Sequence, residues 1–171
     1  MTENITIRDA QATDLEVVLK LNEAFVHFLS PLDLAGLAAL GAEAAYFRVV
    51  ELEGNVAAFL IAYTPGSDYQ SDNYQWFDSR YDDFAYIDRI VVAARAQGKA
   101  LGVKLYDDLA EFAQEQGLAK LTCEYNIQPM NEGSARFHER YGFKEIGQQE
   151  LAGGQKRVSL QAFAIGANQS E

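Results

Sequence analysis

Residues 90–102, with the sequence IVVAARAQGKALG, hold the pattern that decides the fold of this chain. An apolar, strand-like run passes through a turn of small residues into an amphipathic helix. Amide groups in the first turn of a helix have no intrahelical partner, and the helix dipole adds about half a positive charge there. Small residues at Gly98, Ala100 and Gly102 let a pyrophosphate come close to those amides. The stretch therefore predicts an anion-binding turn between a strand and a helix.

Two common nucleotide-binding patterns do not fit this turn. A dinucleotide-binding unit needs the pattern G-x-G-x-x-G near its start and an acidic residue about 20 positions later, and the glycines here are neither so spaced nor so placed. A phosphate loop of the form G-x-x-x-x-G-K-[ST] would need glycine at Ala93 and Ser or Thr at Ala100. Both patterns are poor descriptions of this chain.

A different pattern fits better. The turn resembles the [QR]-x-x-G-x-[GA] coenzyme A pyrophosphate loop of the GNAT superfamily, which comprises acyl-CoA-dependent N-acyltransferases. Gln97 stands at the Gln/Arg position, and Ala100 replaces the usual glycine. Residues 131–143, NEGSARFHERYGF, resemble the N-x-x-A-x-x-[LF]-Y-x-x-x-G-F helix of the same superfamily, with Ser134 for Ala and His138 for Tyr. Two such blocks, in this order and at this separation, are hard to obtain by chance.

The remaining pattern agrees with the fold that this resemblance implies. That fold is of the α/β (α+β) class, with a mixed, mostly antiparallel central sheet of about seven strands flanked by about four helices. We expect one acyl-CoA N-acyltransferase domain over residues 1–171, with a flexible tail at 166–171. The order β-α-α-β-β-β-α-β-α-β-β places strands at 5–8, 46–52, 56–63, 84–92, 120–127, 143–151 and 157–165, and helices beginning near 13, 30, 101 and 132.

Composition limits the partners. The chain has 171 residues, 49% of them apolar, which is enough for one domain with a substantial core. Its net charge of -11, from 25 acidic and 14 basic residues, argues against nucleic acid and anionic membranes and favours a cationic small molecule. The single Cys123 cannot form an intrachain disulfide, and no leader or spanning segment stands out. We therefore expect a soluble cytoplasmic protein, with a homodimer as a possible assembly.

The resemblance also implies a cofactor site. Strands that end at Val92 and near Ile127 are expected to splay apart, so that pantetheine amides pair with the exposed strand edge. The cosubstrate would be acetyl-CoA, and no metal is needed. The positions that match the family's CoA contacts are Ile90, Val91 and Val92 for pantetheine, Gln97, Gly98, Lys99, Ala100, Leu101 and Gly102 for the diphosphate, and Asn131, Ser134 and Phe137 elsewhere on the CoA.

The implied reaction is a direct attack of an amine on the acyl thioester. A strand N–H near Val92 would hold the developing oxyanion. An alkylamine has a pKa of about 10.4 and a thiol one of about 8.5, so the base should matter more than the acid. Asp88 is the candidate base because the family often carries an acidic residue at this strand position. An ion pair of Asp88 with Arg89 or Arg80 is the structural alternative.

The second block holds the candidate acids. His138 occupies the position of the family's thiolate-protonating tyrosine, and imidazole can donate a proton. A helix histidine is also commonly structural. Tyr141, one turn further on, is the substitute donor, with packing before Gly142 as its alternative role. His27, alone on the first helix, is expected to be structural.

Residues 67–83 contain five aspartates and five aromatic residues just before the strand that carries Asp88. Tyr74, Trp76 and Phe77 are the candidates for binding a cationic amine. The alternative is a surface loop whose aromatic residues attach it to the domain. Lys99 and Arg95 are candidates for added positive charge near the phosphates, with solvated surface as the alternative.

Three other functions stay open. A non-catalytic acyl-CoA sensor would bind the thioester without turnover, an interaction scaffold would not bind it, and an O-acyltransferase would need hydroxyl acceptors. The sequence does not identify the acceptor.

Overall fold

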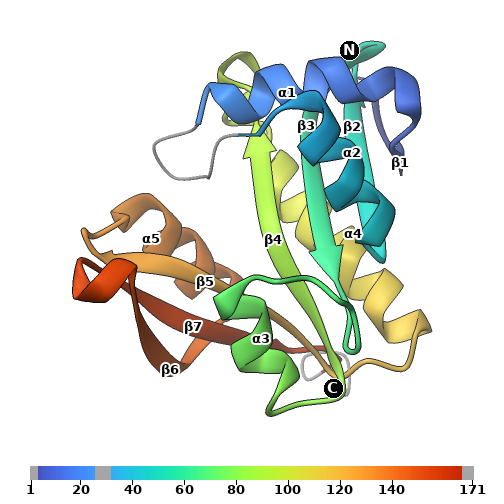
Figure 1. The fold of residues 1–171 in the computed structure, drawn as a ribbon. Coiled ribbons are helices and arrows are strands. Elements are labelled where there is room, and N and C mark those ends of the chain that lie inside the picture. The colour runs from blue at the N-terminus through green and yellow to red at the C-terminus, as the bar shows by residue number, and fades with distance from the viewer. Residues whose placement is uncertain (1–3, 26–31, 167–171) are drawn as a thin grey trace. The chain divides into compact units, whose positions relative to one another are not determined.

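The computed structural model describes residues 4–25 and 32–166. Its contacts group into two compact units: unit 1 is Met1–Tyr63 with Ile87–Leu109, and unit 2 is Thr64–Tyr86 with Ala110–Glu171. The chain passes between the units inside strand β4 (Phe84–Val92) and inside helix α4 (Leu101–Glu115). Figure 1 shows the elements of each unit. The expectation of one domain over residues 1–171 stays a prediction.

The described residues form seven strands and five α-helices. The strand order is β1-β2-β3-β4-β5-β7-β6. Strands β4 and β5 pair in parallel, while the pairs β1–β2, β2–β3, β5–β7 and β6–β7 are antiparallel. This is the mixed, mostly antiparallel sheet that the family resemblance implies. One helix was not expected: α3 (Asp72–Asp78) lies inside the segment read as a loop.

Unit 1 begins with an antiparallel meander of β1 (Ile5–Asp9), β2 (Tyr46–Leu52) and β3 (Asn55–Tyr63). The β2–β3 hairpin turns at Glu53 and Gly54, whose φ angles are 52° and 83°, and this left-handed pair matches the twist of the strands. Every residue of β3 from 57 to 63 is buried, so this strand forms the centre of the unit.

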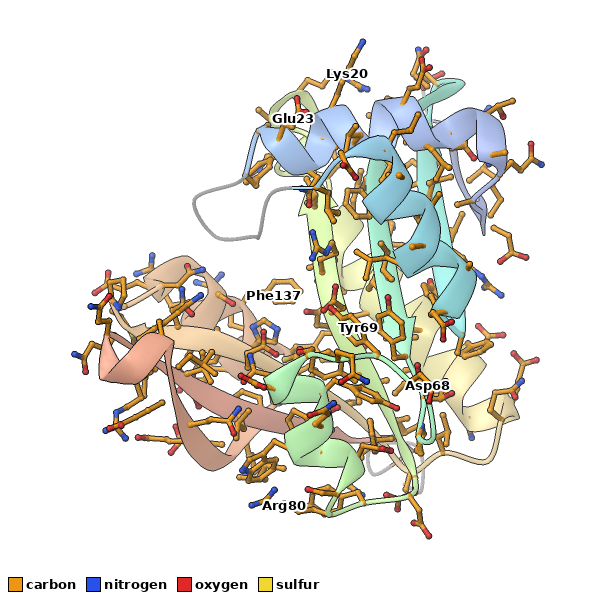
Figure 2. The ribbon with its side chains drawn as sticks, in the orientation of Figure 1. Lys20, Glu23, Asp68, Tyr69, Arg80 and Phe137 are labelled. Atoms are coloured by element: carbon orange, nitrogen blue, oxygen red, sulfur yellow. The ribbon has the colours of Figure 1, made fainter. Side chains whose placement is uncertain are left out.

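Helices cover both faces of the unit 1 strands. Helices α1 (Leu15–Glu23) and α2 (Leu34–Glu43) lie on one face and α4 on the other (Figure 1). Successive residues of β2 show the division, because Phe47 packs on Gly41 of α2 while the Tyr46 hydroxyl donates to Asp108 of α4 at 2.7 Å. On the outer side of α1, Lys20 and Glu23 point into solvent (Figure 2).

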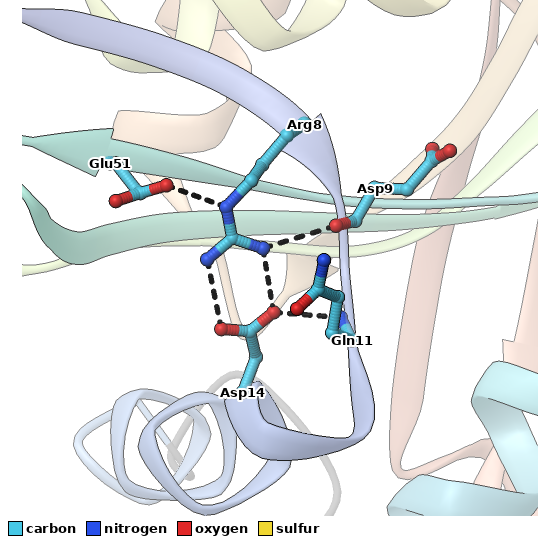
Figure 3. A network of polar contacts seen from close by, with 5 residues as sticks. All are labelled: Arg8, Asp9, Gln11, Asp14 and Glu51. Atoms are coloured by element: carbon cyan, nitrogen blue, oxygen red, sulfur yellow. Dashed lines mark hydrogen bonds and ion pairs between the residues drawn. The ribbon is translucent and has the colours of Figure 1, made fainter.

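The start of α1 differs from the predicted capping box at Thr13. A 3₁₀ turn, Ala12–Asp14, precedes the helix, and the Gln11 amide donates to the Asp14 carboxylate at 2.7 Å. The Arg8 guanidinium donates to Asp14 at 2.8 and 3.0 Å and to Glu51 at 2.6 Å (Figure 3). These hydrogen bonds from Arg8 hold the pKa of Asp14 below its ordinary value. The acidic cap therefore ties α1 to strands β1 and β2.

Helix α2 begins at Leu34, where the Asp33 side chain accepts a hydrogen bond from the Gly36 amide at 2.7 Å. The start predicted from Ser30 and Pro31 lies outside the described residues, as does His27.

Unit 2 is built on β5 (Lys120–Gln128), β7 (Lys156–Ala164) and β6 (Lys144–Leu151). Helices α3 and α5 (Glu132–Tyr141) cover opposite faces of these strands. Trp76 of α3 lies over Gly147 of β6, where an added Cβ would come within 2.7 Å of the indole. On the other face Tyr141 of α5 meets Phe163 of β7 edge-on, with ring centroids 4.9 Å apart.

The prediction of a loop over residues 67–83 is wrong in part. This segment holds the seven-residue helix α3, and the Ser71 hydroxyl caps its first turn by accepting from the Tyr74 amide at 3.3 Å. A helix of two turns is too short to show a clear apolar repeat, which is why periodicity failed to predict it. Burial of Tyr74 and Phe77 fixes the helix to unit 2.

The other boundaries fall close to those expected. Helix α4 ends before Gly117 and α5 before Gly142, and both glycines have positive φ angles, 77° and 118°. Of the expected tail, residues 167–171 lie outside the described residues. In the part of the chain that the structure describes, no helix is both long and apolar enough to span a bilayer.

Candidate acyl-CoA site

The predicted anion-binding turn lies in unit 1, between β4 and α4. A 3₁₀ turn, Ala94–Ala96, follows the strand, and Gln97 returns to an extended conformation. Gly98 and Ala100 then have positive φ angles of 86° and 60°. Helix α4 begins at Leu101, and the Ala100 carbonyl accepts its hydrogen bond from the Lys104 amide at 3.0 Å. Two left-handed residues therefore stand between the end of β4 and the first turn of α4.

Three hydrogen bonds hold this turn in place. The Ala93 amide donates to the Ala57 carbonyl at 2.8 Å, and the Arg95 guanidinium donates to the Val56 carbonyl at 2.9 Å. The Gln97 side chain reaches back and donates to the Val92 carbonyl at 3.2 Å. Arg95 and Gln97 therefore shape the turn through their side chains, a role that the sequence reading did not assign to Arg95.

The surface of the turn is open where the diphosphate is expected. Gln97, Gly98 and Ala100 are exposed, and nothing lies within 4 Å of the position that a Cβ would take on Gly98. Leu101 is buried and anchors the first turn of α4. Helix-start amides beside an exposed, small-residue turn suit an anionic ligand. On β4, Ile90 and Val92 are half-buried while Val91 is buried.

Asp88, the predicted base, forms an ion pair inside unit 1. Its Oδ2 atom accepts from Arg89 Nε at 2.9 Å, and the side chains of Asp88 and Arg89 are only 7% and 6% exposed. Arg89 Nη1 donates in turn to Asn22 Oδ1 on α1 at 3.0 Å. The pKa of the Tyr63 hydroxyl on β3 is raised, mainly by burial and to a smaller extent by the negative charge of Asp88. Asp88 thus forms the ion pair with Arg89 that was the alternative to a catalytic role. Its catalytic role stays a prediction.

The second sequence block forms α5 in unit 2. Asn131 is its N-cap, and its side chain accepts from the Ser134 amide at 3.2 Å. Phe137 is half-buried on the helix (Figure 2), with its ring 6.4 Å from that of Tyr141. The three predicted CoA contacts of this block, Asn131, Ser134 and Phe137, therefore lie on the first two turns of one helix.

His138 is buried among aromatic rings. It stacks on Tyr125 at 5.7 Å and meets Phe143 edge-on at 5.0 Å. Its Nδ1 atom lies 2.7 Å from the Ser134 carbonyl oxygen, and since a carbonyl can only accept, Nδ1 carries the proton. Burial lowers the pKa of His138 below its ordinary 6.5. A neutral imidazole whose proton is held by a backbone oxygen fits a packing role better than that of a proton donor.

Tyr141 packs in the same aromatic cluster. Its ring lies 5.7 Å from Phe143 and 4.9 Å from Phe163. The ring is half-buried. These contacts agree with the packing alternative, and the acid role of Tyr141 stays a prediction.

The aromatic residues predicted to bind substrate separate into two environments. Tyr74 and Phe77 are fully buried, and the Tyr74 hydroxyl donates to the Thr64 carbonyl at 2.5 Å. Trp76 is half-buried, with the Arg80 guanidinium 4.0 Å above its ring at the end of α3 (Figure 2). Burial favours the packing role for Tyr74 and Phe77 over the predicted amine box, and a cation already lies on the Trp76 ring.

The structure adds a carboxylate that the sequence reading missed. Glu124 of β5 accepts a 2.6 Å hydrogen bond from the hydroxyl of Tyr86, which is buried on β4. The two strands pair in parallel over Phe84–Tyr86 and Lys120–Thr122, two residues before Glu124. The available signal was an acidic residue in the middle of a predicted strand, directly after Cys123. Within residues 4–25 and 32–166 no three His, Cys, Asp or Glu side chains are grouped to hold a metal ion.

The family of this chain is given by comparison with known proteins. A family model described as the acetyltransferase (GNAT) family matches residues 14–143, which is more than half of the chain and includes both sequence blocks. A comparison with curated proteins gives no significant match.

Solved structures share the fold at low sequence identity. Ard1 from Thermoplasma volcanium has a TM-score of 0.76 and 18% identity, covering 94% of this chain and 97% of that one. The protein yncA from Salmonella typhimurium, solved with its cofactor acetyl-CoA, has a TM-score of 0.68 and 22% identity over 95% and 94%. The aminoglycoside acetyltransferase AAC(6')-Ib in complex with coenzyme A has a TM-score of 0.75 and 22% identity over 98% of each chain.

Proposed function

Because the chain belongs to the GNAT acetyltransferase family, we propose that it transfers the acetyl group of acetyl-CoA to a primary amine of a small molecule. The observation that carries the proposal is the exposed turn at residues 97–102, with its left-handed Gly98 and Ala100 at the start of α4. Two relatives in fold were solved with acetyl-CoA or coenzyme A, which supports the same type of cosubstrate here.

The reaction needs no covalent enzyme intermediate. The acceptor ammonium loses one proton to a carboxylate, for which Asp88 is our candidate, directly or through a water molecule. The amine nitrogen then bonds to the thioester carbonyl carbon, and a strand N–H near Val92 stabilises the oxyanion. The carbon–sulfur bond breaks, and the second amine proton leaves the nitrogen. The products are the N-acetyl amine, coenzyme A as its thiol, and one proton.

The charge of the chain supports a cationic acceptor. A net charge of -11 attracts cations over a distance and repels nucleic acid and anionic surfaces. The segment 67–83 contributes five of the aspartates. A small alkylamine, protonated at neutral pH, matches this field better than a neutral or anionic acceptor.

A non-catalytic acyl-CoA sensor is the second candidate. Two observations favour it: Asp88 is already paired with Arg89, and the proton on Nδ1 of His138 is held by a backbone carbonyl. A sensor would bind acetyl-CoA and release no thiol with any amine. Turnover therefore separates the two functions.

Binding can be tested with a matched pair of glycine variants. Gly98 and Gly54 have φ angles of 86° and 83° and open space around both Cβ positions, so Gly98→Ala and Gly54→Ala should lose similar stability. We expect acetyl-CoA to raise the melting temperature of the wild-type chain and of Gly54→Ala, and to do so much less for Gly98→Ala. No shift of the wild-type chain at saturating acetyl-CoA would overturn acyl-CoA binding.

Turnover is tested by thiol release from acetyl-CoA with a panel of alkylamines, amino acids, polyamines and hydroxyl compounds. We expect release with at least one primary amine and none with the hydroxyl acceptors. Binding without release across the whole panel would favour the sensor.

A further inference from the structure

A buried polar chain links helix α1 to strand β4 within unit 1. Asn22 of α1 is fully buried, and its Oδ1 atom accepts from Arg89 Nη1 at 3.0 Å. The same guanidinium donates through Nε to Asp88 Oδ2 at 2.9 Å. One planar group thus spans two acceptors, one on the helix and one on the neighbouring residue of the strand.

Regular strand geometry does not by itself produce this contact. Successive side chains of a strand point to opposite faces, yet Asp88 and Arg89 meet. The hydrogen bond to Asn22 holds the guanidinium from the helix side. The arrangement is therefore fixed at both ends of the Arg89 fork.

Stability alone is a weak reason for burying these charges. Removing an ion pair from water costs free energy that the mutual attraction of the charges barely offsets, and apolar residues of similar volume often serve as well or better. Helix α1 already buries Val18. The charged pair directly precedes Ile90, on the strand that leads to the proposed acyl-CoA turn.

We infer that Arg89 is a positioning residue for acetyl transfer: anchored by Asn22, it orients the Asp88 carboxylate to accept the amine proton. This inference rests on the proposed function. Arginine suits the task because its fork is planar and its donors are fixed relative to each other, whereas lysine presents a single point charge on a flexible stem.

The test is a double-mutant cycle with a matched control. Arg89→Lys keeps the charge but cannot span both acceptors, and we expect kcat to fall roughly ten- to a hundred-fold while the KM for acetyl-CoA stays unchanged. In an Asp88→Asn background, followed with enough enzyme to measure residual thiol release, Arg89→Lys should lower kcat no further, because residues that act as a unit are not additive.

Arg8→Lys is the control. Arg8 is also a guanidinium fork in unit 1, bridging Asp14 and Glu51 (Figure 3), and it has no place in the proposed site. We expect it to lower the melting temperature without lowering kcat.

A second variant covers the case in which Arg89→Lys does not fold. Asn22→Ala removes the anchor and leaves the ion pair, and it should lower kcat several-fold in the wild-type background and not in Asp88→Asn. Equal losses in both backgrounds, or an unchanged kcat, would overturn the inference while leaving the proposed function in place. Failure of the wild-type chain to release thiol with any amine would instead overturn the proposed function.

Discussion

Two carboxylates, one in each unit, have opposite kinds of partner. Asp88 of β4 in unit 1 is bound by the cationic guanidinium of Arg89, whereas Glu124 of β5 in unit 2 is bound by the neutral hydroxyl of Tyr86. A guanidinium compensates the negative charge and orients the group, while a phenol only orients it. Two strand carboxylates can therefore differ in chemistry, because the atoms around each one decide which proton transfers it can serve.

The same contrast holds for the two sequence blocks. In unit 1 the block ends in an exposed turn, where a ligand would be bound by backbone amides. In unit 2 the block is a helix whose candidate acid, His138, is buried among aromatic rings, and burial lowers its pKa. Unit 1 thus holds an exposed turn and, on β4, a buried ion pair, whereas unit 2 holds its histidine inside a core.

The largest effects are expected when each carboxylate is neutralised in turn. Asp88→Asn should lower kcat/KM for the amine by 10²–10⁴, the usual contribution of a general base. Glu124→Gln keeps an oxygen acceptor for Tyr86 and should cost less than about ten-fold. The Asp88→Asn loss should shrink at high pH, where the amine loses its proton without help, given an alkylamine pKa of about 10.4. The measurement is the pH profile of thiol release for both variants.

The opposite ranking would also be informative. If Glu124→Gln gives the larger loss and Asp88→Asn gives a loss independent of pH, the proton acceptor belongs to unit 2. The ion pair of Asp88 would then have only a structural role in unit 1.

The fold could be predicted to a large extent because its elements are long enough to show their periods. The apolar face of α4, the hairpin turn at Glu53 and Gly54, and the cap at Asn131 each have a local cause that the sequence displays. Helix α3 could not be predicted because two turns are too few to show an apolar repeat. Its stability comes from the burial of Tyr74 and Phe77.

The chemistry of the site could be predicted less well, because partners far apart in sequence decide it. Asn22 and Arg89 are 67 positions apart, and Tyr86 and Glu124 are 38 apart. Motif spacing predicts where a strand-to-helix turn for acyl-CoA should lie, since such a turn is local backbone. It cannot say whether a carboxylate meets a guanidinium or a phenol, or that the Nδ1 proton of His138 is held by its own helix.

A smaller effect is expected at the exposed turn of unit 1. Ala100 has a φ of 60°, a left-handed conformation that costs a residue with a Cβ roughly 1–2 kcal/mol. Ala100→Gly removes this strain, partly offset by the greater freedom of glycine in the unfolded chain. We expect stability to rise by up to about 1 kcal/mol and the Kd for acetyl-CoA to fall several-fold, as measured by denaturant melts and calorimetry. Unchanged affinity would mean that the diphosphate does not approach residue 100.

The smallest change in rate is expected in the core of unit 2. His138→Phe keeps an aromatic ring against Tyr125 and Phe143 and removes the ionisable group, so kcat should stay within about three-fold, whereas loss of a general acid would cost at least about a hundred-fold.

The pKa of His138 is lowered in the folded chain, so below its unfolded value of about 6.5 the unfolded chain binds more protons than the folded one. The stability linked to neutral His138 is therefore complete above that pH and is lost as the pH falls toward the folded pKa. Denaturant melts from pH 7.5 to 5.5 should show this loss for the wild-type chain and a smaller one for His138→Phe. A hundred-fold drop in kcat with unchanged pH dependence of stability would show that the histidine in unit 2 is reached by the reaction, and the contrast between an open unit 1 and a closed unit 2 would fail.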